Sequence, residues 1–310
     1  MTMELWTGAL QAVLALVAAP LLQGWIKWLK AQMQGRHGPS IWQPYRDLFK
    51  YSRKGEVISG HTSWIFRAAP VGLLTTTVVA AMLLPSPLVA AALPAMSGAA
   101  IGELLLFVYL LAMGRFCLAL AGLDAGSSFG GMGSSREMYV AALAEPALIL
   151  AALVLMIDAG TTNLTAIGET VRQAGWDWWS ASHLLAFLAL AVLVVAETGR
   201  VPVDNPDTHL ELTMIHEGMI LEYSGPSLAL IQLAVWMKQW LLLNVWLQVM
   251  VPFGQGWMFA GLFCLLLALV GVGLALVESF FAKVRIFRVP RMMGASLMLG
   301  VLALLARFVQ

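Results

Sequence analysis

The stretch that decides the fold is residues 257–281, which read WMFAGLFCLLLALVGVGLALVESFF and hold one charged residue, Glu278. About 20 predominantly apolar residues in a helix cross the ~30 Å hydrocarbon core of a bilayer. Comparable runs recur along the chain, so we expect about eight spanning helices, at residues 5–26, 64–84, 101–123, 137–157, 181–198, 225–249, 257–281 and 292–309. The sequence therefore predicts an all-α, polytopic membrane protein in which residues 1–310 form a single transmembrane domain.

The composition of the whole chain agrees with this fold class. Hydrophobic residues make up 60% of the chain and charged residues 11%, whereas soluble domains carry about 25% charged residues. The formal net charge of +1 argues against a nucleic-acid binder. The two cysteines, Cys117 and Cys264, lie in apolar runs, and an iron–sulfur cluster needs about four cysteine ligands. We therefore expect neither a cofactor nor a metal within this chain.

The distribution of basic residues predicts the orientation in the membrane. Segment 27–67 holds eight of the 18 Lys and Arg residues, and segment 283–291 holds four. With Arg136 and Arg200, fourteen fall on one side of the predicted spans. Because positive charge concentrates in cytoplasmic loops, this side is predicted to face the cytoplasm. We expect a multi-pass protein of the cell inner membrane with both termini on the non-cytoplasmic side.

The connection 199–224 is unusually acidic for a cytoplasmic loop. It reads GRVPVDNPDTHLELTMIHEGMILEYS and, with the preceding Glu197, holds six acids against one base. One interpretation is a solvated acidic loop. Its many apolar residues favour a second one, a docked amphipathic helix whose acids point into the protein. His209 and His216 are seven residues apart, which is not the i,i+4 spacing of a zinc helix, so proton transfer or hydrogen bonding fits them better.

Three charged residues lie within predicted spans. Glu145 is about 12 Å along the fourth span and precedes Pro146, while Arg115 and Lys238 are near the middle of the third and sixth spans. Each such charge costs about 2.5–3.5 kcal/mol at the centre of a membrane helix, so a partner or a function is expected. One interpretation is that these residues pair only to hold helices in register. The other is a proton or ion path that links them to the acids of 197–222.

The first cytoplasmic segment, 27–63, combines basic, aromatic and turn residues. Residues 35–50 read GRHGPSIWQPYRDLFK, and a short amphipathic helix is expected from Tyr45 onward. The predicted apolar face holds Leu48, Phe49 and Tyr51, and basic residues face away. This helix could lie on anionic lipid, dock a peripheral protein or close over segment 199–224.

Three motifs carry a resemblance to a known family. They are R-x-G-P at 36–39 followed by QPYRD-x-x-K at 43–50, AET-x-R-x-P-x-D at 196–204 with EYSG at 222–225, and SRE at 135–137 followed by Glu145. They resemble the membrane subunit shared by respiratory complex I and the membrane-bound group 4 nickel–iron hydrogenases, and the resemblance covers nearly the whole chain. Only three residues separate the Gly-Pro turn from Gln43-Pro44, which is similar to the hydrogenase branch.

The resemblance implies a division of labour among subunits. Partner subunits would hold the nickel–iron centre and the iron–sulfur clusters: the hydrogenase large and small subunits and a ferredoxin-like iron–sulfur subunit. This chain, which contacts membrane lipid, would anchor them and connect them to antiporter-like membrane subunits. Arg36, Arg46, Asp47, Lys50, Arg136 and Arg200 would form the docking and junction surface. The proton path would comprise Glu145, Glu197, Asp204, Glu211, Glu217 and Glu222, with His209, His216, Arg115 and Lys238.

Two other functions remain open at this point. The first is a quinone-binding membrane subunit of an NADH:quinone oxidoreductase, which uses the same scaffold. The second is a stand-alone secondary transporter that uses the acids as an ion site. The inverted repeats typical of many such transporters are not visible in the sequence.

Overall fold

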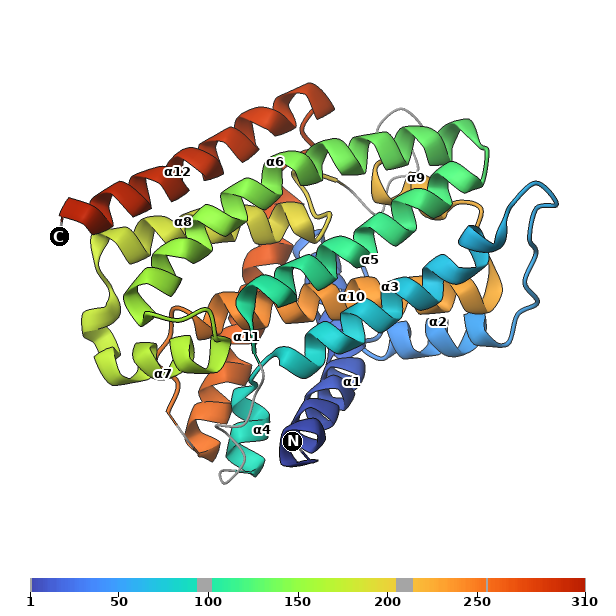
Figure 1. Cartoon of the computed structure of the whole chain (residues 1–310). Helices are drawn as coiled ribbons and strands as arrows, with labels where there is room; N and C mark the ends of the chain where they lie inside the picture. The colour runs from blue at the N-terminus through green and yellow to red at the C-terminus, as the bar shows by residue number, and fades with distance from the viewer. Residues whose placement is uncertain (1, 94–101, 205–213, 255, 310) are drawn as a thin grey trace.

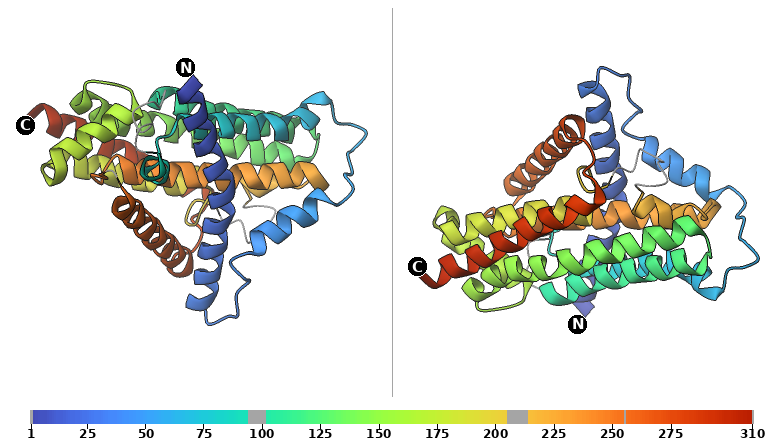
Figure 2. Two further views of the ribbon diagram at one scale, coloured as in Figure 1. Left: turned by 90° about the horizontal axis from the view of Figure 1, so that it is seen from below. Right: turned by 90° about the horizontal axis from the view of Figure 1, so that it is seen from above.

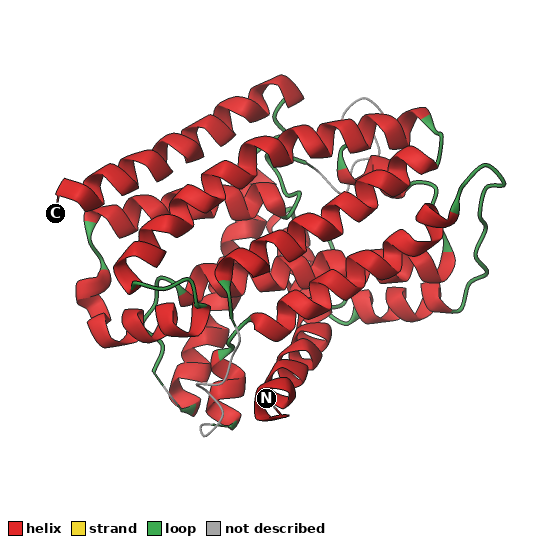
Figure 3. Cartoon of the chain, in the orientation of Figure 1, coloured by secondary structure: helices red, strands yellow, loops and turns green. Residues whose placement is uncertain are grey.

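A computed structural model describes residues 2–93, 102–204, 214–254 and 256–309 (Figure 1). Its long helices are α1 (Thr2–Met33), α3 (Trp64–Leu83), α5 (Leu104–Asp124), α6 (Ser128–Ala159), α8 (Ala181–Glu197), α10 (Gly225–Gln248), α11 (Trp257–Phe280) and α12 (Val289–Val309). The shorter elements are α2 (Gln43–Ser52), α4 (Pro87–Ala92), α7 (Leu164–Ala174), η2 (Gly175–Trp178), α9 (His216–Ile220) and η3 (Ile286–Arg288). The described residues form no strand (Figure 3), so the predicted all-α fold class is confirmed.

Among the described residues, seven helices are long and apolar enough to cross a membrane. The remaining predicted span, 181–198, corresponds to α8, which has 17 residues. It follows a bend of 118° after the segment Leu164–Trp178, and counting this bent pair as one span gives eight. The chain is therefore a multi-pass membrane protein whose spans lie close to the predicted positions.

The spans form a bundle in which two helices cross the others steeply. α3 packs on α5, α12 packs on α6 and α8, and α10 packs on α3. The two crossing helices are α1 and α11, which pack against each other (Figure 2). α5 and α6 approach closely because small residues meet there: a Cβ added to Gly130 would lie 2.3 Å from the carbonyl oxygen of Gly122.

The bundle has two chemically different ends. We call one the basic end; it carries α2, α9, η3 and the connections 34–42, 53–63, 125–127, 198–204 and 281–285. The opposite end carries α4, α7, η2, the start of α1 and the end of α12 (Figure 1). Helix ends are capped at both, as when Asp124 at the end of α5 accepts hydrogen bonds from the backbone N–H groups of Ser63 (2.8 Å) and Phe66 (3.2 Å) at the start of α3.

The two cytoplasmic segments differ in detail from the predictions. α2 begins at Gln43, two residues earlier than expected, because Pro44 fits the first turn of a helix. Phe49, which was predicted on the apolar face, is 57% exposed, and the Arg53 guanidinium lies over its ring at 3.9 Å. In segment 199–224 the described helix is only α9, while residues 205–213 lie outside the described part of the chain.

Candidate functional site

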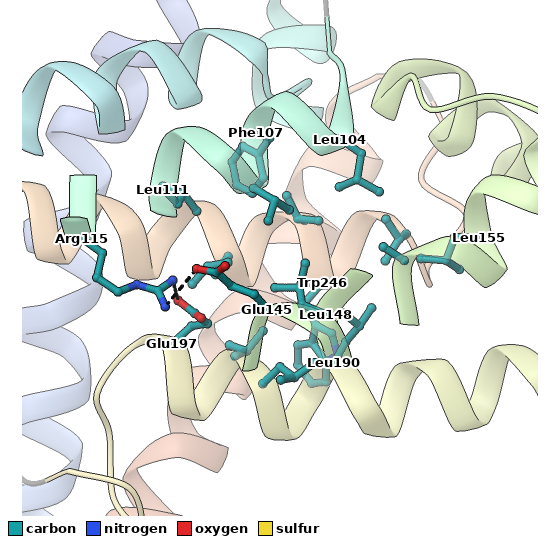
Figure 4. Close-up of a pocket in the computed structure, with 17 residues that line it drawn as sticks. Leu104, Phe107, Leu111, Arg115, Glu145, Leu148, Leu155, Leu190, Glu197 and Trp246 are labelled. Carbon is teal, nitrogen blue, oxygen red and sulfur yellow. Dashed lines mark hydrogen bonds and ion pairs between the residues drawn. The ribbon is translucent and has the colours of Figure 1, made fainter. Parts of the chain in front are cut away.

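A buried arginine on α5 is the centre of an ionic network inside the bundle. The Arg115 guanidinium is 2.7 Å from the Glu197 carboxylate at the end of α8, 3.6 Å from Glu145 and 3.8 Å from Glu137, both on α6. Figure 4 shows Arg115 pointing between Glu145 and Glu197. The network therefore joins the consecutive helices α5 and α6 to α8.

A second cation joins the same carboxylate. The ammonium group of Lys238, on α10, is 2.8 Å from the Glu197 carboxylate, whose side chain is only 5% exposed. Glu197 thus bridges Arg115 and Lys238. Three carboxylates and two cations share the site. Because the carboxylates outnumber the cations by one, the network can accept a proton on a carboxylate. We call Arg115, Glu137, Glu145, Glu197 and Lys238 the central cluster.

A polar cavity of about 450 Å³ opens between the central cluster and the basic end. Glu137, Glu197 and Lys238 line its inner part, and Asp47, Glu217 and Tyr51 line it nearer to α2 and α9. About 10–15 Å³ of such volume accommodates one water molecule, so this cavity has room for many. We call it the vestibule. Predicted site residues from α2, α9 and two spans, α8 and α10, thus lie around one space.

A second group of ionic residues lies on another wall of the vestibule. Arg200 is 5% exposed and donates to the carboxylate of Glu278 on α11 (2.8 Å) and to the side-chain carbonyl of Gln239 (2.7 Å). It also donates to Gln23 on α1, and Glu278 is 3.1 Å from Lys30. The predicted docking surface included Arg200, but the structure buries this side chain, so it positions the 199–204 segment from within.

Asp204 ties the same segment to the last connection of the chain. Its carboxylate is 2.5 Å from the ammonium group of Lys283 and accepts a hydrogen bond from the backbone N–H of His216 (3.1 Å). The backbone N–H of Val284 donates to the carbonyl of Pro202 at 2.8 Å. Asp204 therefore holds α9 and the α11–α12 connection together, and His216 lines the vestibule beside it.

Beyond the central cluster the interior becomes apolar. A cavity of about 50 Å³ extends from Arg115, Glu145 and Glu197 along α5, α6, α8 and α10 (Figure 4). Its remaining walls are leucine, valine, alanine, phenylalanine and tryptophan side chains, among them Phe107 and Trp246. Glu197 lines both cavities, and the Glu145 side chain is 35% exposed on the flank of α6. The ionic network therefore reaches the lateral surface of the bundle at α6 and does not continue to the opposite end.

The tyrosines near the vestibule are held as neutral donors. Burial raises the pKa of Tyr51, with smaller contributions from the negative charges of Asp47 and Glu217. Burial also raises the pKa of Tyr223, whose hydroxyl donates to the carbonyl of Phe66 at 2.7 Å and whose ring stacks on that phenyl ring. Tyr223 of the EYSG motif thus connects the start of α10 to the start of α3.

The remaining predicted site residues are distributed as follows. Arg36, Arg46 and Lys50 are exposed at the basic end. Asp47 lines the vestibule and accepts from the Gln43 amide (2.9 Å), while Arg136 donates to the carbonyl of Met214 (2.9 Å). Glu222 is exposed and does not line the vestibule. His209 and Glu211 lie outside the described residues.

Several residues of these networks were not predicted as site residues. Lys30 and Glu278 stand near span ends, and Gln239 resembles any other polar residue of a span. Glu137 is the first residue of the predicted span 137–157, but α6 begins nine residues earlier, at Ser128. A signal exists for Glu278, because it is the one charge in residues 257–281. At the opposite end, Asp158 of α6 is 2.7 Å from His183 of α8 and also pairs with Arg307 of α12. Within the described residues, no group of three or more His, Cys, Asp or Glu side chains has the geometry of a metal site.

The family model described as NADH dehydrogenase matches residues 7–308. The chain is 38% identical to hydrogenase-4 component C of Escherichia coli strain K12 over 260 residues, 84% of this chain and 79% of that protein. It is 32% identical to formate hydrogenlyase subunit 4 of the same organism, over 92% and 93% of the two chains. It is also 30% identical to an NADH-quinone oxidoreductase subunit of Rubrobacter xylanophilus, over 66% and 61% of the two chains.

A solved structure confirms the fold. The chain superimposes on a subunit of the archaeal membrane-bound sulfane sulfur reductase with a TM-score of 0.81, over 97% of this chain and 99% of that one, at 19% identity. The match of the family model to almost the whole length, the two relatives above 30% identity and the eight-helix arrangement agree with one another. This chain belongs to the NADH dehydrogenase family, the family of complex I subunit 1.

Proposed function

We propose that this chain is the membrane-anchor and proton-path subunit of a membrane-bound hydrogenase. Its similarity to hydrogenase-4 component C and formate hydrogenlyase subunit 4 supports the assignment to a hydrogenase complex. In this proposal the basic end faces the cytoplasm of the cell and docks the nickel–iron and iron–sulfur subunits. Within the membrane, the sides of its spans contact antiporter-like membrane subunits.

The observation that carries the proton-path role is the position of Glu197. This carboxylate lines the polar vestibule on one side and the apolar cavity on the other, and it bridges Arg115 and Lys238. A proton that enters from the basic end reaches the central cluster through polar groups and water-sized space. It then meets an apolar region, where an unaccompanied charge is strongly unfavourable.

Glu145 is the exit from this chain in the proposed path. It is the member of the central cluster on the flank of α6 and its side chain is 35% exposed. A carboxylate at that depth facing hydrocarbon would be costly, so it requires a polar partner on a neighbouring subunit. The path therefore runs from the basic end to Arg115 and Glu197 and leaves laterally through Glu145. This route needs no channel to the opposite end of the chain.

The second candidate function is a quinone-binding subunit. A cavity of about 450 Å³ is within the range of small-molecule sites, which favours this alternative. Its lining includes the charged side chains of Lys27, Lys30, Asp47 and Arg200, whereas a quinone ring with an isoprenoid tail requires mainly apolar walls. If a soluble quinone analogue were reduced by the complex in a manner blocked by substitutions of Lys30 or Asp47, the quinone assignment would replace the hydrogenase one.

The test of the proton path is Glu145→Gln, which keeps the shape of the side chain and removes its charge. In membrane vesicles supplied with the electron donor of the complex, we expect the partner subunits to be retained. The proton movement per hydrogen formed, followed with a pH-sensitive dye, should fall by about tenfold or more because the lateral exit is lost. An uncoupler should no longer accelerate hydrogen formation.

Asp177→Asn is the matched control, because it also removes a carboxylate but at the exposed η2 element of the opposite end. It should leave both the assembly and the proton signal unchanged. Unchanged proton movement per hydrogen in Glu145→Gln would contradict the path. Loss of assembly with normal activity in each remaining complex would make Glu145 a structural partner of Arg115.

A further inference from the structure

The connection between α11 and α12 carries a basic and aromatic patch that the proposed proton path does not use. The patch consists of the side chains of Phe280, Phe281, Arg285, Phe287, Arg288 and Arg291. All six are exposed, and the three phenyl groups are 80%, 61% and 90% accessible. Exposed apolar groups of this size in one place mark a contact with a membrane or another molecule.

The connection divides its residues between two sides. Lys283 and Val284 face the protein, where they hold Asp204 and the carbonyl of Pro202. The three arginines are exposed and have no ion-pair partner among the residues that the structure describes. Because Lys283 and Val284 anchor the connection, the backbone that carries the exposed arginines is held in place.

The length of α12 bears on the level of the patch in a bilayer. α12 has 21 residues, so it is about as long as the hydrocarbon core is thick, and the patch lies at its first turn. Only residues 281–288 join α12 to α11. At this level, phenyl groups would be within reach of the acyl region and guanidinium groups within reach of the phosphates.

The helices on either side of the patch also expose apolar side chains. α11 packs on α1 and α4, whereas α12 packs on α6 and α8. Leu276 of α11 and Met298 of α12 are among their exposed apolar residues. Acyl chains could cover such side chains while the headgroup remains at the arginines.

We propose that the patch is a binding site for an anionic phospholipid at the basic end. The arginines bind the headgroup phosphate, and Phe280, Phe281 and Phe287 insert beside the acyl chains. Planar guanidinium groups bind phosphate oxygens through paired hydrogen bonds, which makes the site selective for an anionic headgroup. The lipid would cover exposed apolar side chains of α11 and α12 and hold the connection that Asp204 anchors from the inside.

The experiment titrates the intact, detergent-purified complex with dioctanoyl phosphatidylglycerol or dioctanoyl phosphatidylcholine and counts bound lipids by native mass spectrometry. The wild-type complex should retain the anionic lipid in preference to the zwitterionic one. The variant Arg285→Gln/Arg288→Gln/Arg291→Gln should lose affinity for the anionic lipid by roughly 100-fold, since each basic residue near an anionic surface contributes about 1 kcal/mol.

The matched control is Arg53→Gln/Lys54→Gln/Arg67→Gln, which removes the same charge from exposed residues elsewhere at the basic end. It should change the affinity by less than about twofold. Equal losses in the two variants, or equal retention of the two lipids, would overturn the site. Loss of a partner subunit from the first variant with unchanged lipid binding would identify the patch as a protein contact and would also overturn it.

Discussion

Glu197 is the residue on which the central cluster depends. Its carboxylate is the nearest acid to both Arg115 (2.7 Å) and Lys238 (2.8 Å), and it is almost fully buried. Removing one partner of a buried ion pair leaves an uncompensated charge and costs about 3–5 kcal/mol. A variant of Glu197 therefore loses stability whether or not the residue carries protons. The two roles can be separated only when a second substitution removes the cation left without its partner.

We predict that Glu197→Gln lowers the unfolding temperature of the purified complex by several degrees and that Glu197→Gln/Lys238→Met recovers more than half of the loss. The recovery follows because the second change removes the cation that the first one isolated. Thermal unfolding in detergent measures both. Glu169→Gln, which breaks the exposed pair with Arg172, should cost at most about 1 kcal/mol and is the control. Additive losses in the double variant would mean that the pair is not coupled.

At the residue scale the sequence identifies the unusual charges but not all of their partners. Arg115, Glu145 and Lys238 are recognisable because each interrupts an apolar run. Arg115 and Glu145 lie 3.6 Å apart. Glu137 could not be assigned because hydropathy places it at the end of the predicted span 137–157, where charges are common, whereas α6 begins at Ser128. Its contact with Arg115 depends on how α5 and α6 cross, which hydropathy does not encode.

At the scale of elements, the crossing of α5 and α6 determines the spacing of the central cluster, because α6 carries Glu137 and Glu145. The crossing relies on Gly130, where an added Cβ would lie 2.3 Å from a backbone oxygen of α5. A backbone atom cannot move aside as a side chain can. The helices would have to separate, and their charged side chains with them.

We predict that Gly130→Ala destabilises the complex by about 1–3 kcal/mol, as overpacking does, and also reduces the proton movement per hydrogen. Gly131→Ala is the matched control: nothing lies within 4 Å of its added Cβ, so it should be neutral or slightly stabilising. Thermal unfolding and the dye assay measure the two effects. If Gly130→Ala and Gly131→Ala behave alike, the close approach of α5 and α6 does not limit the site.

The positions of the spans were predictable because the bilayer imposes a length and an apolar composition on each helix. Trp64–Leu83 and Trp257–Phe280 differ from the predicted ranges by one residue at one end. The short elements were less predictable. α9 covers five residues, and its place is determined by contacts such as that of Gly133 on α6, where an added Cβ would lie 2.8 Å from the carbonyl oxygen of Ile215. Such contacts between distant segments have no periodic pattern in the sequence.

At the scale of the whole molecule, charge and hydropathy differ between the two ends of the helix bundle. The basic end combines exposed cations with a polar vestibule, and the interior beyond Glu197 is apolar. This asymmetry is suited to a subunit that receives a soluble partner at one end and passes charge sideways. The exposed face of α2 is then the proposed docking surface, since Arg46 and Lys50 point away from the bundle while Asp47 and Tyr51 line the vestibule.

We predict that Arg46→Ala weakens retention of the peripheral hydrogenase subunits on membranes. The exposed guanidinium contributes charge attraction to the partner, so Arg46→Ala membranes should release the peripheral subunits at a lower ionic strength than wild type does. Because salt screens this attraction, the difference in affinity should be largest at low salt and should shrink as the ionic strength rises. Immunoblots of the washed membranes measure retention. Arg172→Ala removes an exposed arginine at the opposite end and should leave retention unchanged. If Arg46→Ala membranes keep the peripheral subunits as firmly as wild type at every salt concentration, α2 is not the docking surface, and its cations face lipid instead.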